Sequence, residues 1–347
     1  MLSYILKRIA LMVPTLLGAL TLTFVVIQFV PGGPVEQVMA EARTRGGGGA
    51  DGGGAYRARG DSDAKQIEAL KKLYGFDKPV HVRYFEMLKN FASFDLGRSF
   101  LHNKGVWELI KEKLPVSISL GLWTFLLSYL ISVPLGIFKA VREGSTLDVL
   151  STLAVLAGFA VPGFVLGVFM IVLFAGGSFW DVFPLRGLTS ENWATLSWPA
   201  RVADYFWHLA MPLTCLVIGS FATMTLLTKN TFIEEMRKQY VLVARAKGLS
   251  QQRVLWKHIF RNALIPLVTG FPAAFVGAFF AGALLIETLF SLDGLGLLGY
   301  ESVVRRDYPV VLGSLYLFTL IGLAVKLVSD VVYTLVDPRV QFGAVGK

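Results

Sequence analysis

Long apolar runs alternate with polar stretches along the whole chain. Each of six runs has at least 22 residues, which exceeds the roughly 20 residues that an α-helix needs to cross a bilayer. The runs cover residues 9–30, 114–138, 149–174, 206–227, 264–286 and 310–332. The pattern therefore predicts an all-α polytopic membrane protein with six transmembrane helices.

Two proline positions refine this pattern. Pro115 lies at the start of the second run, and a proline fits the first turn of a helix because its missing N–H has no partner there. Pro162 and Gly163 lie near the middle of the third run and are expected to break that helix. The first run is longer than the apolar core of a signal peptide, which has about 7–15 residues. It is therefore predicted to be an uncleaved transmembrane helix.

The polar stretches set the predicted domain boundaries. Residues 1–30 hold the N-terminus and the first transmembrane helix, 31–113 form a small helical insertion, 114–334 form a core of helices 2–6, and 335–347 form a tail. Within the insertion, residues 46–54 contain seven glycines in nine positions, a composition typical of a flexible linker. Short helices are predicted at residues 63–74, 82–91 and 106–113.

Composition and charge agree with a membrane location. Hydrophobic residues make up 54% of the chain and charged residues 16%, whereas soluble domains carry roughly 25% charged residues. The net charge of +9 is therefore assigned to membrane loops rather than to nucleic-acid binding. Placing both termini in the cytoplasm puts 14 basic residues in cytoplasmic segments and four in the short outer loops. The positive-inside rule thus predicts cytoplasmic N- and C-termini.

A basic polar segment, residues 229–263, separates the fourth and fifth runs. It holds eight of the 33 basic residues. Residues 240–247 are compatible with a helix, Gly248 can adopt the left-handed conformation that ends a helix, and Ser250 can cap the next one. With the predicted topology, this helix–Gly–helix unit lies on the cytoplasmic face, where it can push against a partner protein.

The chain lacks the common catalytic motifs. It has no Gly-x-x-x-x-Gly-Lys-Ser/Thr phosphate loop, no His-Glu-x-x-His zinc motif and no Gly-x-Ser-x-Gly nucleophile elbow. Its single cysteine, Cys215, excludes an internal disulfide and a cysteine metal cluster. We therefore predict no catalytic residue, no metal and no cofactor in this chain. Residues 294–299 match Gly-x-Gly-x-x-Gly, but a dinucleotide site needs a preceding strand, so a tight turn is predicted there instead.

Few ionisable residues lie inside the apolar runs. Lys326 and Asp330 are one helical turn apart in the sixth run and are predicted to form an ion pair or an anchor, with a functional role as the alternative. Gln28 and Glu287 lie near the outer ends of runs and are interpreted as structural. No carboxylate lies beside the predicted helix break. An ion-coupled secondary transporter that acts without an ATPase is therefore the less favoured alternative.

The polar segment carries a recognisable motif, Tyr240-x-x-x-Ala244-Arg245-Ala246-Lys247-Gly248-Leu249-Ser250, followed by His258, Asn262-Ala263 and Pro266. Other motifs are Pro31-Gly32-Gly33-Pro34-Val35, Tyr74-Gly75-Phe76-Asp77-Lys78-Pro79 and Phe290-Ser291-Leu292-Asp293-Gly294. Together these motifs resemble ABC importer inner-membrane permeases of the dipeptide/oligopeptide family, over essentially the whole chain. Phe183-Pro184-Leu185-Arg186-Gly187-Leu188 and Leu255-Trp256-Lys257-His258 are similar to the Yej-type branch. The glutamate and first alanine of the general signature are replaced here by Leu242 and Val243.

This resemblance implies a type I ABC importer permease of the bacterial inner membrane, with residues 31–113 as a periplasmic insertion. It implies import of peptides, including microcin C-like peptide–nucleotides, by alternating access. The implied partners are a second homologous permease in a heterodimer, an ABC ATPase with two nucleotide-binding domains that bind ATP and Mg²⁺, and a periplasmic peptide-binding protein. The residues implied in ATPase coupling are Tyr240, Ala244, Arg245, Ala246, Lys247, Gly248 and Ser250. The small residues among them are expected to permit close docking, and the basic ones to pair with acidic rims of the ATPase.

Overall fold

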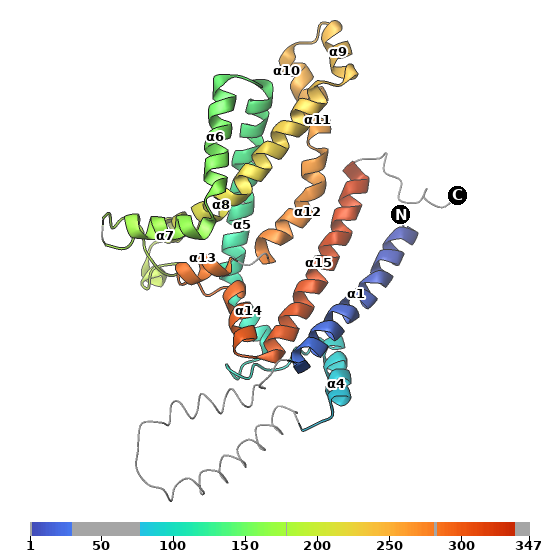
Figure 1. Ribbon diagram of the computed structural model, residues 1–347, viewed down its shortest axis with the longest axis vertical. Coiled ribbons are helices and arrows are strands. Elements are labelled where there is room, and N and C mark those ends of the chain that lie inside the picture. Colours follow the sequence, from blue (N-terminus) through green and yellow to red (C-terminus); the bar gives the residue numbers. More distant parts are fainter. Residues whose placement is uncertain (1, 30–76, 178, 281–282, 337–347) are drawn as a thin grey trace, which may run out of the picture. The chain divides into compact units, whose positions relative to one another are not determined.

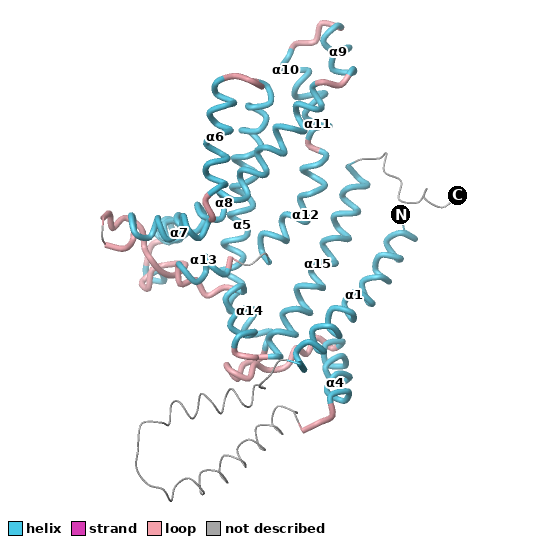
Figure 2. Tube along the Cα trace, viewed as in Figure 1, coloured by secondary structure: helices cyan, strands magenta, loops and turns pink. Residues whose placement is uncertain are grey.

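The computed structural model describes residues 2–29, 77–177, 179–280 and 283–336 (Figure 1). Regular secondary structure in these ranges is helical, with one isolated antiparallel bridge between Arg98 and Gly105 (Figure 2). The predicted all-α class is therefore confirmed. The predicted glycine-rich linker at 46–54, the helix at 63–74 and residues 337–347 of the predicted tail 335–347 lie outside the described residues.

The chain divides into two compact units. One comprises residues 1–8, 113–297 and 322–347, and the other comprises residues 9–112 and 298–321. Among the described residues, four helices are long and apolar enough to cross a membrane: α1 (Leu2–Phe29), α5 (Val106–Val141), α8 (Trp198–Met236) and α15 (Tyr308–Val336). Two bent helix pairs raise the number of spans to as many as six if each pair is one span. The described part of the chain thus agrees with a multi-pass membrane protein of four to six spans.

The first bent pair is α6 (Thr146–Ala160) and α7 (Gly163–Phe174), which meet at 90°. The predicted break at Pro162 and Gly163 is therefore confirmed. Pro162 takes an extended conformation at the N-cap of α7. A Cβ on Gly163 would lie 2.7 Å from the carbonyl oxygen of Cys215 in α8, so glycine is needed for this close approach.

The second bent pair joins residues 251–263 to α12 (Ile265–Phe280) at an angle of 46°. The fifth apolar run does not form one helix up to residue 286, because a separate helix, α13 (Leu284–Leu289), follows α12. The prediction that Pro115 lies in the first turn of its helix is also wrong. Helix α5 begins at Val106 and continues through Pro115, so the predicted short helix 106–113 and the second span are one element.

A buried apolar cluster forms the core of the first unit. Its buried members come from α5, α8, α13 and the segment after α13, with α7 packed against them, and the most buried are Leu120, Leu209, Met211, Cys215, Phe290 and Leu292. Cys215 is only 2% exposed, as expected for a small buried hydrophobe. Helices α5 and α8 also approach closely at Gly136, where a Cβ would lie 2.5 Å from Cβ of Thr228.

In the second unit, α4 (Val80–Ala92) packs through aromatic contacts and agrees with the helix predicted at 82–91. Phe91 contacts Tyr316 with ring centroids 5.1 Å apart, and Tyr84 contacts Phe24 at 5.3 Å. The carboxylate of Asp307 is fully buried and accepts hydrogen bonds from the loop at residues 99–101, including one of 3.0 Å from the Phe100 amide. This carboxylate holds the loop in place.

The glycine-rich stretch at 294–299 begins α14 (Leu295–Val304). The side chain of Glu287, which is 2% exposed, accepts a 2.7 Å hydrogen bond from the Leu297 amide. A Cβ on Gly294 would overlap this carboxylate, and one on Gly296 would lie 3.1 Å from Oε2 of Glu287. The glycines therefore cradle an anion at a helix N-terminus, but the anion is the chain's own glutamate.

Candidate functional site

The segment between α8 and α12 contains α9 (Gln239–Ala246), α10 (Gln251–Arg253), η2 (Val254–Ile259) and α11 (Phe260–Ala263). We call residues 237–263 the connecting segment. Gly248 has a φ of +79°, and Ser250 Oγ accepts a 3.4 Å hydrogen bond from the Arg253 amide. The predicted helix–Gly–helix geometry is therefore confirmed. Helix α8 continues up to Met236, so the first eight residues of the predicted polar segment 229–263 extend this helix.

The connecting segment has its own apolar core. On α9, Val241 is fully buried and Ala244 is 7% exposed. They form a buried cluster with residues of α5, α8, η2 and α11, namely Ile137, Ala140, Phe232, Val254, Ile259 and Ala263. Ala244 is thus mostly covered by its own chain, and its role in docking a partner stays a prediction. Its small side chain permits α9 to pack closely on this core.

A polar contact network holds the two ends of the connecting segment together. The hydroxyl of Tyr240 donates a 2.7 Å hydrogen bond to Glu235 of α8 and accepts one of 3.3 Å from the side-chain amide of Asn262 in α11. Lys238 forms an ion pair with the same glutamate. Burial, together with the neighbouring Glu235, raises the pKa of Tyr240 to about 12. Tyr240 therefore stays protonated and joins α9 to α8 and α11, and its role in ATPase coupling stays a prediction.

The opposite face of α9 is exposed. Leu242 is 59% exposed and Val243 is 52% exposed. Arg245, Ala246 and Lys247 complete this face, and we call these five residues the α9 surface. Sequence reasoning treated Leu242 and Val243 only as departures from a signature. Val241 and Ala244 are three residues apart and therefore lie on one face of a helix. With that face turned inward, Leu242 and Val243 point outward.

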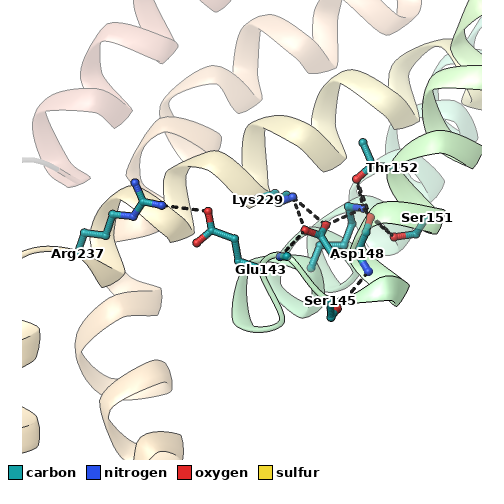
Figure 3. A network of polar contacts seen from close by, with 9 residues as sticks. Glu143, Ser145, Asp148, Ser151, Thr152, Lys229 and Arg237 are labelled. Atoms are coloured by element: carbon teal, nitrogen blue, oxygen red, sulfur yellow. Dashed lines mark hydrogen bonds and ion pairs between the residues drawn. The ribbon is translucent and has the colours of Figure 1, made fainter.

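A cluster of charged and hydroxyl side chains joins α5, α6 and α8, and sequence reasoning did not find it (Figure 3). Its members are Lys139, Asp148, Ser151, Thr152 and Lys229, and we call them the Asp148 cluster. Lys229 Nζ lies 2.7 Å from both carboxylate oxygens of Asp148. Lys139 is fully buried, and its Nζ lies 3.1 Å from Asp148 Oδ1. Two lysines from different helices therefore share one carboxylate at the start of α6.

The predicted pair of Lys326 and Asp330 is replaced by another contact. Asp330 forms an ion pair of 3.1 Å with Arg8 and accepts a 3.2 Å hydrogen bond from the hydroxyl of Tyr4. Arg8 Nε also donates a 2.9 Å hydrogen bond to that hydroxyl. The competing partners come from α1, which is distant in sequence, so spacing along the sixth run alone could not indicate them. Among the described residues, no group of three or more metal-ligating side chains that could hold a metal is found.

Replacing Gly248 is expected to test the backbone geometry of this segment directly. No atom lies within 4 Å of a Cβ placed on Gly248, but its φ is positive. A β-branched side chain is strained there, and we expect Gly248→Val to cost about 1–2 kcal/mol in local stability. Gly248→Asn is the matched control, because asparagine adopts this conformation more readily. Limited proteolysis near residue 248 should be faster in the valine variant alone, and equal rates in both variants would contradict the argument.

The helical architecture and the exposed, internally packed connecting segment define a polytopic membrane protein with a polar segment between two of its apolar helices. Residues 132–342 match the family model described as the binding-protein-dependent transport system inner membrane component. The chain belongs to this family, whose members are membrane permease subunits of ABC transport systems.

Its relatives match along nearly their whole length. The peptidoglycan transport system permease protein YejB of Agrobacterium fabrum is 53% identical, with 98% of each chain covered. The inner membrane ABC transporter permease protein YejB of Escherichia coli O157:H7 is 49% identical, with 98% of this chain and 99% of the relative covered. The di/tripeptide transport system permease protein DppB of Pseudomonas aeruginosa is 33% identical, with the same coverage. The predicted family and its Yej-type branch are therefore confirmed.

Proposed function

We propose that this chain forms part of the transmembrane path of an ATP-driven importer of peptides, and that the connecting segment is its contact with the ATPase. The observation that carries the proposal is the exposed α9 surface on a base that is packed internally and hydrogen-bonded at both ends. A surface of this kind can be displaced as a rigid unit. Membership of the family leads us to expect that an ATPase displaces it.

The chemistry of the α9 surface suits a cleft with an apolar floor and an acidic rim. Leu242 and Val243 supply apolar area that is exposed in this chain, and buried apolar area is the main source of affinity at the centre of an interface. Arg245 and Lys247 would pair with carboxylates around it. ATP and Mg²⁺ would be bound by two nucleotide-binding domains of that partner.

Movement would then pass from the ATPase to the membrane helices. Closure of the nucleotide-binding domains would displace α9, and the buried cluster around Val241 would carry that displacement to α5 and α8. Tilting of the spans would expose the path alternately to the two faces of the membrane. In this arrangement the connecting segment and both termini lie in the cytoplasm, in agreement with the distribution of basic residues.

The remaining partners follow from the same scheme. A second, homologous permease would complete the path, and a periplasmic peptide-binding protein would deliver the substrate to the outer face. The outer contacts would come from the region 31–113 and from residues 291–308, which include α14. Transport proteins that release substrate from a soluble receptor need such a docking face on the side opposite to the ATPase.

Short peptides are the proposed substrate class. The names of the relatives refer to peptidoglycan and to di- and tripeptides, so their shared chemistry is the peptide bond. We extend this class to peptides derived from the cell wall and to microcin C-like peptide–nucleotides. Wall peptides differ from ordinary peptides in their D-amino acids and thus offer a direct comparison.

The complete transporter, purified through this chain and reconstituted in liposomes, tests the proposal. We expect its ATP hydrolysis to rise when the binding protein and a transported peptide are added, using a panel of di-, tri- and wall-derived peptides. The free amino acids of the same composition serve as the control. Peptide uptake by this chain alone under an ion gradient, or ATP hydrolysis indifferent to every peptide, would contradict the proposal and favour an ion-coupled carrier or another substrate.

A further inference from the structure

The Asp148 cluster lies away from the α9 surface and has no part in the docking proposed above. It joins the turn between α5 and α6 to α8 near the point where α8 leads into the connecting segment (Figure 3). We propose that Lys229 and Asp148 are positioning residues that make α6 move with α8 when the ATPase displaces the connecting segment. This inference rests on the proposed function and deepens it by naming the link to α6.

The geometry of the cluster resists sliding. Lys229 Nζ contacts both carboxylate oxygens of Asp148 at 2.7 Å, and the Gly144 amide donates a 3.1 Å hydrogen bond to the same carboxylate. Charge-assisted hydrogen bonds have a narrow range of favourable lengths and directions, whereas apolar helix faces can shift against each other at low cost. Of the contacts between α6 and α8, this one therefore fixes their relative position most strictly.

Burial strengthens the contact. The side chain of Asp148 is 5% exposed and that of Lys229 is 15% exposed. In such surroundings an ion pair is screened far less by salt than on the surface. Lys139 is fully buried and donates hydrogen bonds of 2.7 Å to Ser151 and Thr152. Its ammonium group therefore holds the second turn of α6 to the end of α5 without using Lys229.

Helix α8 is also fixed to α5 at the neighbouring residue. Gly136 of α5 lies so close to Thr228 that a Cβ would have no room. Residues 228 and 229 of α8 thus contact α5 and α6, respectively. A displacement of α8 at residues 228 and 229 would be transmitted to α5 through the close packing of Gly136 and Thr228. It would be transmitted to α6 through the ion pair of Lys229 and Asp148.

The chain contains a matched control for this ion pair. Arg237, the C-cap residue that directly follows α8, pairs with Glu143 of the same α5–α6 turn at 3.0 Å, but the two side chains are 70% and 47% exposed. Exposed ion pairs contribute little, about 0–1 kcal/mol. If any charge contact between α8 and this turn sufficed, Arg237→Met and Lys229→Met would behave alike. If the position of α6 relative to α8 depends on the buried contact, only Lys229→Met should affect transport.

Lys229→Met is the informative variant because it leaves Asp148 paired with Lys139 and with the Gly144 amide. The complete transporter is reconstituted in liposomes with the peptide that stimulates wild-type hydrolysis most. We expect Lys229→Met to assemble and to hydrolyse ATP without peptide at the wild-type rate. Peptide transported per ATP should fall by roughly 5- to 150-fold, the usual range of coupling between two sites. Lys229→Arg should restore most of the peptide transported per ATP, and Arg237→Met should change this ratio less than about twofold.

A second measurement separates transmission of movement from folding. A fluorophore is attached to a cysteine at Thr146 in α6 or at Gln252 in α10, both exposed, while Cys215 stays unlabelled because it is buried. In Lys229→Met, the signal change on ATP addition should persist at residue 252 and be clearly smaller than in the wild type at residue 146, where only the route through α5 and Lys139 remains. An undiminished change at both positions, loss at both, or failure to assemble would overturn the inference. A wild-type transporter that does not respond to peptide would instead refute the proposed function.

Discussion

Replacing Leu242 with aspartate is expected to separate this chain from its ATPase. Leu242 is more exposed than Val243, the other large apolar residue of the α9 surface, at 59% against 52%, so the change should leave the connecting segment folded. At the centre of the proposed interface, the new carboxylate would be buried without a partner. Substitutions at such central positions cost about 2 kcal/mol or more, and 2 kcal/mol corresponds to a roughly 30-fold weaker association. Peptide uptake should fall at least in proportion.

The control for this prediction is Gln252→Asp. Gln252 is exposed on α10, outside the α9 surface, and the substitution adds the same single negative charge. Association with the ATPase is measured by titrating it against the purified permease complex at two salt concentrations. We expect a loss for Leu242→Asp that salt does not repair and little change for Gln252→Asp. Equal losses in the two variants would show that net charge, rather than the apolar face of α9, governs docking.

Replacing Gly294 with alanine is expected to destabilise the protein strongly. The added methyl group would occupy the position of the Glu287 carboxylate. Displacing that side chain adds an overpacking cost of about 1–3 kcal/mol. It also removes the hydrogen bond from the Leu297 amide to a buried carboxylate, and an unsatisfied buried group costs about 1–3 kcal/mol more. We expect a loss of about 3 kcal/mol in the free energy of unfolding.

Gly299 provides a matched control five residues further along. It lies inside α14, and no atom is found within 4 Å of a Cβ placed on it. Gly299→Ala should therefore be neutral or stabilise the helix by up to about 1 kcal/mol. Thermal unfolding of the two variants in the same detergent compares them. A Gly294→Ala protein as stable as the wild type would mean that Glu287 does not cap α14 in the folded protein.

The sequence allowed prediction of those features that depend on neighbouring residues. Gly248 and Ser250 carry local signals for a helix end and a helix start, and the structure has both. The break at Pro162 was predictable for the same reason. The lengths of the helices were less predictable, because the length of an apolar run depends on the thickness of the membrane and does not indicate where the helix ends. Helix α8 therefore extends to Met236, well past the last apolar residue of its run.

Contacts between distant residues were not predictable in this way. Asp148 and Lys229 are 81 positions apart, and Asp330 and Tyr4 are 326 positions apart. No periodicity links such pairs, since their meeting depends on how whole helices pack. The inward position of Ala244 was also missed. Its small size suits both a docking surface and a tight core, and only the burial of Val241 one turn earlier distinguishes the two.

The π-helical stretch η2 joins α10 to α11 within one continuous helical rod. A π-helical turn amounts to an α-helix with one additional residue, and one residue corresponds to about 100° of rotation around the helix axis. Removing a single residue between Val254 and Ile259 would therefore turn α10, and α9 with it, by about 100° relative to α11. The direction in which the α9 surface points is set by this register. An insertion or deletion here would misdirect the surface even if every exposed side chain were retained.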